Sequence, residues 1–276
     1  MLDVIRESCG LLDFHDVADE ARRFLSLPRS DQPPAQKSRL AASQTGSPEA
    51  ARRLFGMSQP IARTIVETYL RHRGITDLHE AGALRFHPRC YYRPDGDAPT
   101  ETWPAMIARV TDLDGRITGA HRTWLDPSGR CKAPIDTPRR AMGELLRNAV
   151  CFGVANDVLA AGEGIETMLS LRCVLSTLPM AAALSANHLA AMLLPLTLRR
   201  LYIARDADAA GDTAVTTLTE RVEASGIEAI TLSPRLSDFN EDLRTLGIDE
   251  LRAALRTQLA PQDVIRFFDW ATAQTG

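Results

Sequence analysis

The chain has 276 residues, of which 45% are hydrophobic, and a formal net charge of −3, which suits one large domain or two modest ones. No apolar run reaches the roughly 18 residues of a membrane span, and the N-terminus lacks a signal-peptide pattern, which favours a cytoplasmic protein without membrane contact. The five cysteines lie far apart and without zinc-ligand spacing, so neither a disulfide framework nor a zinc site is indicated.

Charge is distributed unevenly along the chain. Residues 37–150 hold 18 Lys and Arg against 12 Asp and Glu, whereas residues 151–276 hold 10 against 16. A basic first part joined to an acidic second part suits a polyanion held over a cation-binding site, although ordinary surface variation would give the same counts. Lys37 and Lys132 are the only lysines in this arginine-rich chain.

The first half of the chain divides by composition. Residues 1–27 have an apolar stripe at helical spacing and predict an N-terminal helical segment, and residues 28–48, rich in Pro, Ser and Gln, predict a flexible linker. Residues 49–152 predict an α+β subdomain with a basic surface. It contains a helix capped near Ser47, a second helix that ends at Gly74, and a β-hairpin over 103–126 with its turn at Asp114 and Gly115.

From residue 153 the pattern alternates between strand and helix. Strands are predicted at 157–161, 180–184, 200–204 and 228–232, each followed by a helix: 165–175, 187–195, 209–225 and 238–246. Consecutive βα units predict an α/β domain over 153–248, Rossmann-like, with a parallel sheet and helices on both faces. Residues 249–276 predict a C-terminal helical tail.

Four acidic residues follow the predicted strands of this sheet: Glu163, Asp206, Asp208 and Asp238. The carboxyl ends of parallel strands share one edge, so these side chains are expected to lie near one another, at a repulsive cost that a bound cation would remove. Oxygen ligands of this kind suit Mg²⁺, with Mn²⁺ as a substitute. Taken singly, Asp208 and Asp238 could equally be helix N-caps, and Glu163 a first-turn acid stabilised by the helix dipole.

Three segments carry a resemblance to a known family. GEGIET, IARDADAAGDTA and SDFNEDL resemble, in order and spacing, the motifs of a Toprim domain. Upstream, YLRHRGIT and GRITGAHRTWLDPSGRCKAPIDTPRRAMG resemble the RNA-polymerase core of bacterial DNA primases, and LLDFHDVADEARRFL is similar to the helix that closes their zinc-binding domain. The nearest resemblance is to primase-like proteins of phages, plasmids and other mobile elements, here without the zinc ribbon and without zinc.

The resemblance implies roles for individual residues. Glu163, Asp206 and Asp208 would be catalytic and would bind metal, with Asp238 as an additional metal-site acid. Lys132 would face template or nucleotide, and its arginine neighbours would extend that nucleic-acid-binding surface: Arg122, Arg139 and Arg140. Glu166 and Asn240 are further candidates at positions where the chain departs from the family pattern. Thr167 stands where the family often has aspartate, with Glu166 one place earlier, and Asn240 stands where primases often have another acid.

The resulting expectation is a Mg²⁺-dependent primase-type nucleotidyltransferase that joins nucleoside triphosphates into short RNA primers on single-stranded DNA. A helicase or a separate template-recognition protein is the expected partner. A metal-dependent Toprim nuclease and a non-catalytic module that binds DNA or a partner remain as alternatives.

Overall fold

The computed structural model describes residues 46–272 except 79, 80 and 97, with backbone only at Ala210 and at 269–272. The predicted helical segment 1–27 and the linker up to residue 45 lie outside the described residues. In chain order the elements are α3 (Pro48–Met57), α4 (Ile65–His72), the 3₁₀ turn η1 (Ala81–Ala83), β1 (Leu84–Tyr92), β2 (Glu101–Thr111), β3 (Ile117–Trp124), β4 (Arg139–Gly143), β5 (Val150–Phe152), β6 (Val158–Gly162), α5 (Ile165–Arg172), β7 (Met180–Ala182), α6 (Ala186–Ala191), β8 (Arg200–Ala204), α7 (Ala209–Glu223), β9 (Glu228–Leu232), α8 (Phe239–Thr245), α9 (Ile248–Arg256) and α10 (Pro261–Thr272).

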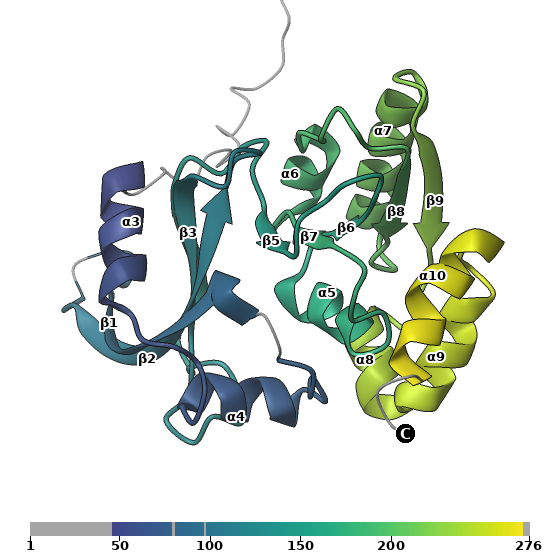
Figure 1. Cartoon of the computed structure of the whole chain (residues 1–276). Coiled ribbons are helices and arrows are strands. Elements are labelled where there is room, and N and C mark those ends of the chain that lie inside the picture. Colours follow the sequence, from purple (N-terminus) through teal and green to yellow (C-terminus); the bar gives the residue numbers. More distant parts are fainter. Residues whose placement is uncertain (1–45, 79–80, 97, 273–276) are drawn as a thin grey trace, which may run out of the picture. The chain divides into compact units, whose positions relative to one another are not determined.

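An antiparallel sheet of order β1-β2-β3-β4 forms the first half (Figure 1). Successive strand residues point to opposite faces, so Ile107 packs under α3 while Met106 joins a second core with α4. The predicted hairpin is confirmed as β2 and β3, and Gly115 in its turn has a φ of 77°, a left-handed conformation that favours glycine. The α3 helix begins where predicted, since the Ser47 hydroxyl accepts a hydrogen bond from the backbone N–H of Ala50.

The second sheet has the order β5-β7-β6-β8-β9. Strands β7, β6, β8 and β9 are parallel, which confirms the predicted α/β arrangement, but the short edge strand β5 pairs antiparallel with β7. A backbone bridge between Thr111 and Ala149 connects the end of β2 to the segment just before β5.

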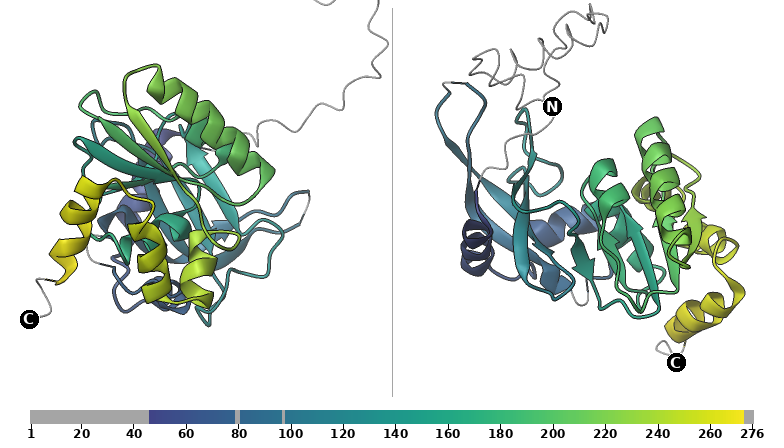
Figure 2. Two further views of the ribbon diagram at one scale, coloured as in Figure 1. Left: turned by 90° about the vertical axis from the view of Figure 1, so that its right-hand side faces the viewer. Right: turned by 90° about the horizontal axis from the view of Figure 1, so that it is seen from above.

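Side-chain alternation along the parallel strands gives the sheet two apolar faces. Ala160 and Tyr202 belong to the core shared with α5, α8, α9 and α10, whereas Ala161 and Ile203 belong to the core shared with α6 and α7. In the left view of Figure 2 the long green helix α7 and the yellow C-terminal helices lie on opposite sides of these strands. The two faces therefore hold the strand ends, and the loops that follow them, in a fixed register.

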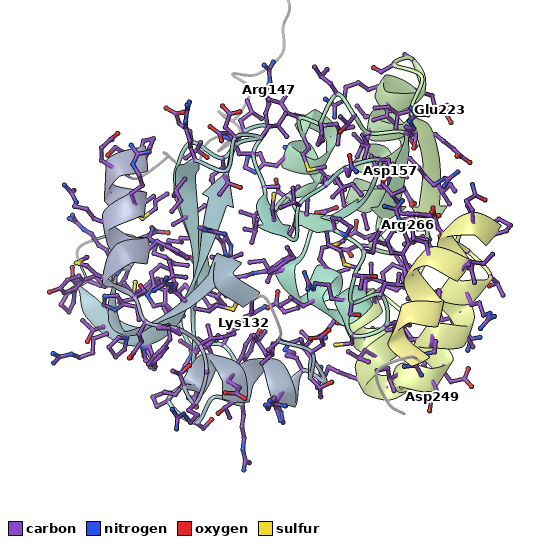
Figure 3. All side chains as sticks on the ribbon, viewed as in Figure 1. Lys132, Arg147, Asp157, Glu223, Asp249 and Arg266 are labelled. Carbon is purple, nitrogen blue, oxygen red and sulfur yellow. The ribbon has the colours of Figure 1, made fainter. Side chains whose placement is uncertain are left out.

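The last helix is attached to the sheet by polar contacts as well as by its apolar face. Asp263, 2% exposed, accepts hydrogen bonds from the Tyr202 hydroxyl (2.6 Å) and from the Arg200 guanidinium (2.7 Å). Arg266 forms a two-pronged ion pair with Asp157, the residue before β6 (Figure 3). Among the described helices, none is both long and apolar enough to cross a membrane.

Candidate active site

Glu163 directly follows β6 and is partly buried. Its backbone carbonyl accepts a hydrogen bond from the N–H of Leu184, a residue in the left-handed region with a φ of 76° just beyond β7. Gly162 before it has no room for a side chain, because a Cβ there would lie 2.7 Å from the Met168 sulfur. The turn that carries Glu163 is thus fixed between the ends of two strands.

The loop after β8 carries Asp206 and Asp208. The N–H of Ala207 between them donates to the carbonyl of Ser237 (2.8 Å), which joins this loop to the one that carries Asp238. Asp208 caps α7 by accepting from the Gly211 N–H, and Asp238 caps α8 by accepting from the Glu241 N–H, each at 2.7 Å. The N-cap reading is therefore correct for both, and each uses one carboxylate oxygen for the cap.

Asp206 differs from its neighbours because it caps nothing. Burial, together with the charges of Glu163, Asp238 and Asp208, raises the pKa of Asp206 to about 6. Burial and the charge of Asp208 likewise raise the pKa of Glu163. The structure therefore brings Glu163, Asp208 and Asp238 within electrostatic range of Asp206 at one edge of the sheet, and these four acids are called the acidic edge below.

The acidic edge fits a divalent cation in its donor set. The Oδ1 atom of Asp206 is buried without a hydrogen-bond partner, and a buried acceptor of this kind is satisfied by a cation. Within the described parts of the chain, no three His, Cys, Asp or Glu side chains already stand together as a ready-made metal group. Rotation of the carboxylates would be needed for them to share an ion, and the metal ligands stay a prediction.

Gly211 is required for the close approach of α7 to the Asp206 loop. A Cβ at this position would lie 2.6 Å from the Asp206 carbonyl oxygen. We expect Gly211→Ala to lower the free energy of unfolding by about 1–3 kcal/mol, although alanine is the better helix former. Urea unfolding measures this, with Gly56→Ala in α3 as the control, since a Cβ there meets nothing within 4 Å. Equal effects of both substitutions would contradict the steric account.

Lys132, labelled in Figure 3, and Arg139, in β4, lie on the side of the antiparallel sheet that faces α5. The Lys132 ammonium is 3.6 Å from the Oε1 atom of Glu166, and the same oxygen accepts a hydrogen bond from the Tyr69 hydroxyl at 2.7 Å. Arg139 interacts electrostatically with Glu166, with Lys132 and also with Asp206. Arg139 is therefore an electrostatic neighbour of both the acidic edge and the Lys132–Glu166 pair.

His121 and Tyr69 belong to this charged cluster, and neither was predicted. Burial lowers the pKa of His121 to about 4, with Glu166 opposing and Arg139, Lys132 and Arg122 reinforcing that effect, so its imidazole is neutral near pH 7. Tyr69 lies in YLRHRGIT, where helical periodicity identifies it only as a core residue.

Arg122 and Arg140 occupy the opposite face of the sheet. They are cross-strand partners in β3 and β4, and their guanidinium groups lie over the rings of Trp124 (5.0 Å) and Tyr92 (4.9 Å). Arg139, one residue earlier than Arg140, necessarily points the other way. The four predicted basic residues are thus divided between the two faces of the antiparallel sheet. Of these four, Lys132 and Arg139 lie on the face next to Glu166.

Asn240 is a buried structural residue in this chain. Its amide nitrogen donates to the Arg73 carbonyl and to the Ser170 hydroxyl, both at 2.9 Å, while its oxygen accepts from the Arg73 guanidinium. Both of its amide hydrogens and its oxygen thus have partners within the protein, which explains why an amide suits this position.

Asn240→Asp is expected to destabilise the fold, because a carboxylate cannot donate to the Arg73 carbonyl or to Ser170. The expected loss is about 1–3 kcal/mol in the free energy of unfolding, reduced in part by attraction to the Arg73 guanidinium. Urea unfolding compares it with Asn156→Asp, a substitution at an exposed residue that should be near neutral. A neutral Asn240→Asp would show that these hydrogen bonds contribute little.

Two family models match the sequence. A Toprim domain matches residues 158–249, and a domain of unknown function, DUF7146, matches residues 45–152. Among curated proteins, none matches the chain.

Solved structures of primases are similar in fold. A DNA primase domain from Pseudomonas aeruginosa has a TM-score of 0.53 at 17% identity, over 76% of this chain and 78% of that one. The zinc-binding and RNA polymerase domains of the Aquifex aeolicus primase have a TM-score of 0.54 at 14% identity, over 96% and 72%. A DnaG primase catalytic domain bound to single-stranded DNA has a TM-score of 0.54 at 16% identity, over 77% and 81%. At such identities the likeness shows the fold alone.

Proposed function

This chain contains a Toprim domain within the fold of a bacterial primase catalytic core, and on that basis we propose that it is a divalent-metal-dependent nucleotidyltransferase of primase type. The observation that carries the proposal is Asp206, a partly buried carboxylate with an unpartnered oxygen and a raised pKa, in range of three further acids. Such repulsion is costly unless a cation is part of the working site.

The residues of the acidic edge divide the work of nucleotidyl transfer. Asp206, Asp208 and Asp238 would hold Mg²⁺, whose charge stabilises a phosphoryl group under attack. The oxygen of the primer 3′ hydroxyl bonds to the α-phosphorus of the nucleotide while the bond from that phosphorus to pyrophosphate breaks. Glu163, whose raised pKa corresponds to an increased proton affinity, accepts the proton of this hydroxyl.

Lys132 and Arg139 supply positive charge beside the acidic edge. Lys132 lies beside Glu166, and Arg139 interacts with Asp206. Phosphates of the template or of an incoming nucleoside triphosphate bound by these cations would lie close to the reacting hydroxyl. Single-stranded DNA is the proposed template, and binding through phosphates predicts strong salt dependence.

Primer synthesis by the purified chain tests this proposal. The chain is incubated with single-stranded templates of varied sequence and labelled ribonucleotides, with Mg²⁺, with Mn²⁺ and with a chelator. We expect short, template-dependent RNA only with metal. No product with either metal over all templates would contradict the proposal, and metal-dependent cleavage of the template instead would identify a nuclease.

A further inference from the structure

Glu166 makes contacts that link the two halves of the described structure. It lies in the first turn of α5 in the Toprim domain, with its side chain 13% exposed. Its contacts are to the other half: the Tyr69 hydroxyl of α4 at 2.7 Å and the Lys132 ammonium, from the segment between β3 and β4, at 3.6 Å. Both contacts are made by the same oxygen, Oε1 of Glu166. Glu166 itself lies three residues after Glu163.

The shared oxygen is held firmly. Tyr69 is fully buried and donates a hydrogen bond to Oε1, so the position of the carboxylate does not depend on Lys132. The Ser170 hydroxyl donates to the Glu166 carbonyl at 2.7 Å and is itself joined to Asn240, which anchors this stretch of α5. Glu166 therefore presents a negative charge at a fixed point, whereas a lysine alone has a flexible four-carbon stem.

Lys132 is placed so that it can reach a second anion. Its side chain is 24% exposed, and at 3.6 Å the carboxylate is within ion-pair distance but beyond an ordinary hydrogen bond, so the ammonium retains donors for another acceptor. Two further cations, Arg139 and Arg73, act on Lys132, and His121 beside them is neutral. The negative charge of Glu166 offsets the repulsion between Lys132 and these arginines.

We propose that Glu166 is a positioning residue, which fixes the Lys132 ammonium so that it binds a phosphate of single-stranded DNA or of a nucleoside triphosphate beside the acidic edge. This role rests on the proposed function for its consequence, but the placement of Lys132 can be measured without any catalysis. It also gives Glu166 work distinct from that of Glu163, three residues before it.

Electrostatics around Lys132 support this placement. Burial lowers the pKa of Lys132, the charge of Glu166 opposes that effect, and Arg139 and Arg73 add to it. Burial would raise the pKa of Glu166, but Lys132 and the Tyr69 hydroxyl bring it below the usual value. Without the carboxylate, the ammonium should lose its proton at lower pH.

The scarcity of lysine makes the measurement simple. Reductive methylation with ¹³C-formaldehyde labels two lysines, Lys37 and Lys132, and the terminal amine, and NMR follows each dimethylamine against pH. We expect the Lys132 signal of Glu166→Gln to titrate at lower pH than that of the unmodified sequence, with Lys37 unchanged. Glutamine keeps an oxygen for Tyr69, so the variant should fold; thermal unfolding checks this. Glu223→Gln, at an exposed residue of α7, is the matched control (Figure 3).

Binding of phosphate ligands tests the consequence. Affinities for a labelled oligodeoxynucleotide and for ATP are measured separately, which distinguishes the two sources of phosphate. Glu166→Gln and Lys132→Ala should each weaken one of these by roughly tenfold, and the double variant should be no weaker than Lys132→Ala, since the two residues act as one unit. Glu166→Asp should recover part of the loss.

Two results would overturn the inference. One is a Lys132 titration that Glu166→Gln leaves unchanged, and the other is a Lys132→Ala variant with undiminished affinity for both ligands. If instead both expectations hold while the unmodified chain makes no primer with any metal, Glu166 positions Lys132 as proposed and only the nucleotidyltransferase proposal fails.

Discussion

Glu163→Gln is expected to reduce primer synthesis by about 10²–10⁴-fold, the usual contribution of a positioned acid or base. Burial and the charge of Asp208 raise the pKa of Glu163, which suits a group that must take up a proton, and an amide cannot do so. Removal of one repelling charge should leave the fold intact. The rate of ribonucleotide incorporation at saturating template measures the effect.

Glu223→Gln is the control for this experiment, because it makes the same chemical change at an exposed residue. Its rate should equal that of the unmodified chain. A Glu163→Gln variant that synthesises primers within a few-fold of the normal rate would show that the acidic edge is not the catalytic centre, whatever its affinity for metal.

Asp206→Asn is expected to increase stability near pH 7.5 when no metal is present. The pKa of Asp206 is raised to about 6 in the folded chain from an ordinary value of 3.8, by burial first and then by Glu163, Asp238 and Asp208. The folded state therefore holds this proton more tightly than the unfolded state. Its contribution is most favourable below about pH 4, and is lost as the pH rises through about 6.

The size of this effect follows from the shift, discounted for the part of Asp206 that water still screens. At pH 7.5 the free energy of unfolding of Asp206→Asn should be about 1–2 kcal/mol higher than that of the unmodified chain, and near pH 4 the two values should be equal. Urea unfolding at both pH values gives the difference, in which the other carboxyl groups cancel. Added Mg²⁺ should stabilise the unmodified chain more than the variant. A difference that is the same at both pH values would contradict the assigned repulsion.

Much of the second half of the fold could be predicted from the sequence. The parallel strands β6, β7 and β8 are buried on both sides and are short apolar runs such as RLYIA, so their predicted positions agree closely with the structure. The antiparallel edge strand β5 was missed, because three residues carry too little pattern.

Strands β1 and β4 were also not predicted. The β1 strand contains Pro88 and an irregularity between His87 and Cys90, and β4 begins with two arginines. Alternation of apolar and polar residues in β1 covers only Leu84–His87 before the irregularity interrupts it, and β4 has none. Their pairing with β2 and β3 decides their conformation, which local sequence cannot show.

The site shows the same division. Acids that follow parallel strands must share an edge, so the grouping of Glu163, Asp206, Asp208 and Asp238 could be predicted from topology. The face of each arginine could not, because a shift of one residue in register moves a side chain to the other side of the sheet. Contact between Glu166 and Lys132 depends on how the two halves pack, and no local pattern encodes it.

The most direct test of the central claim, a cation held by the acidic edge, is anomalous diffraction from crystals soaked in Mn²⁺. We expect a manganese peak bound by oxygens of Asp206, Asp208 and Asp238, which disappears in Asp206→Asn. Absence of a peak at this edge, or a peak bound by other residues, would contradict it.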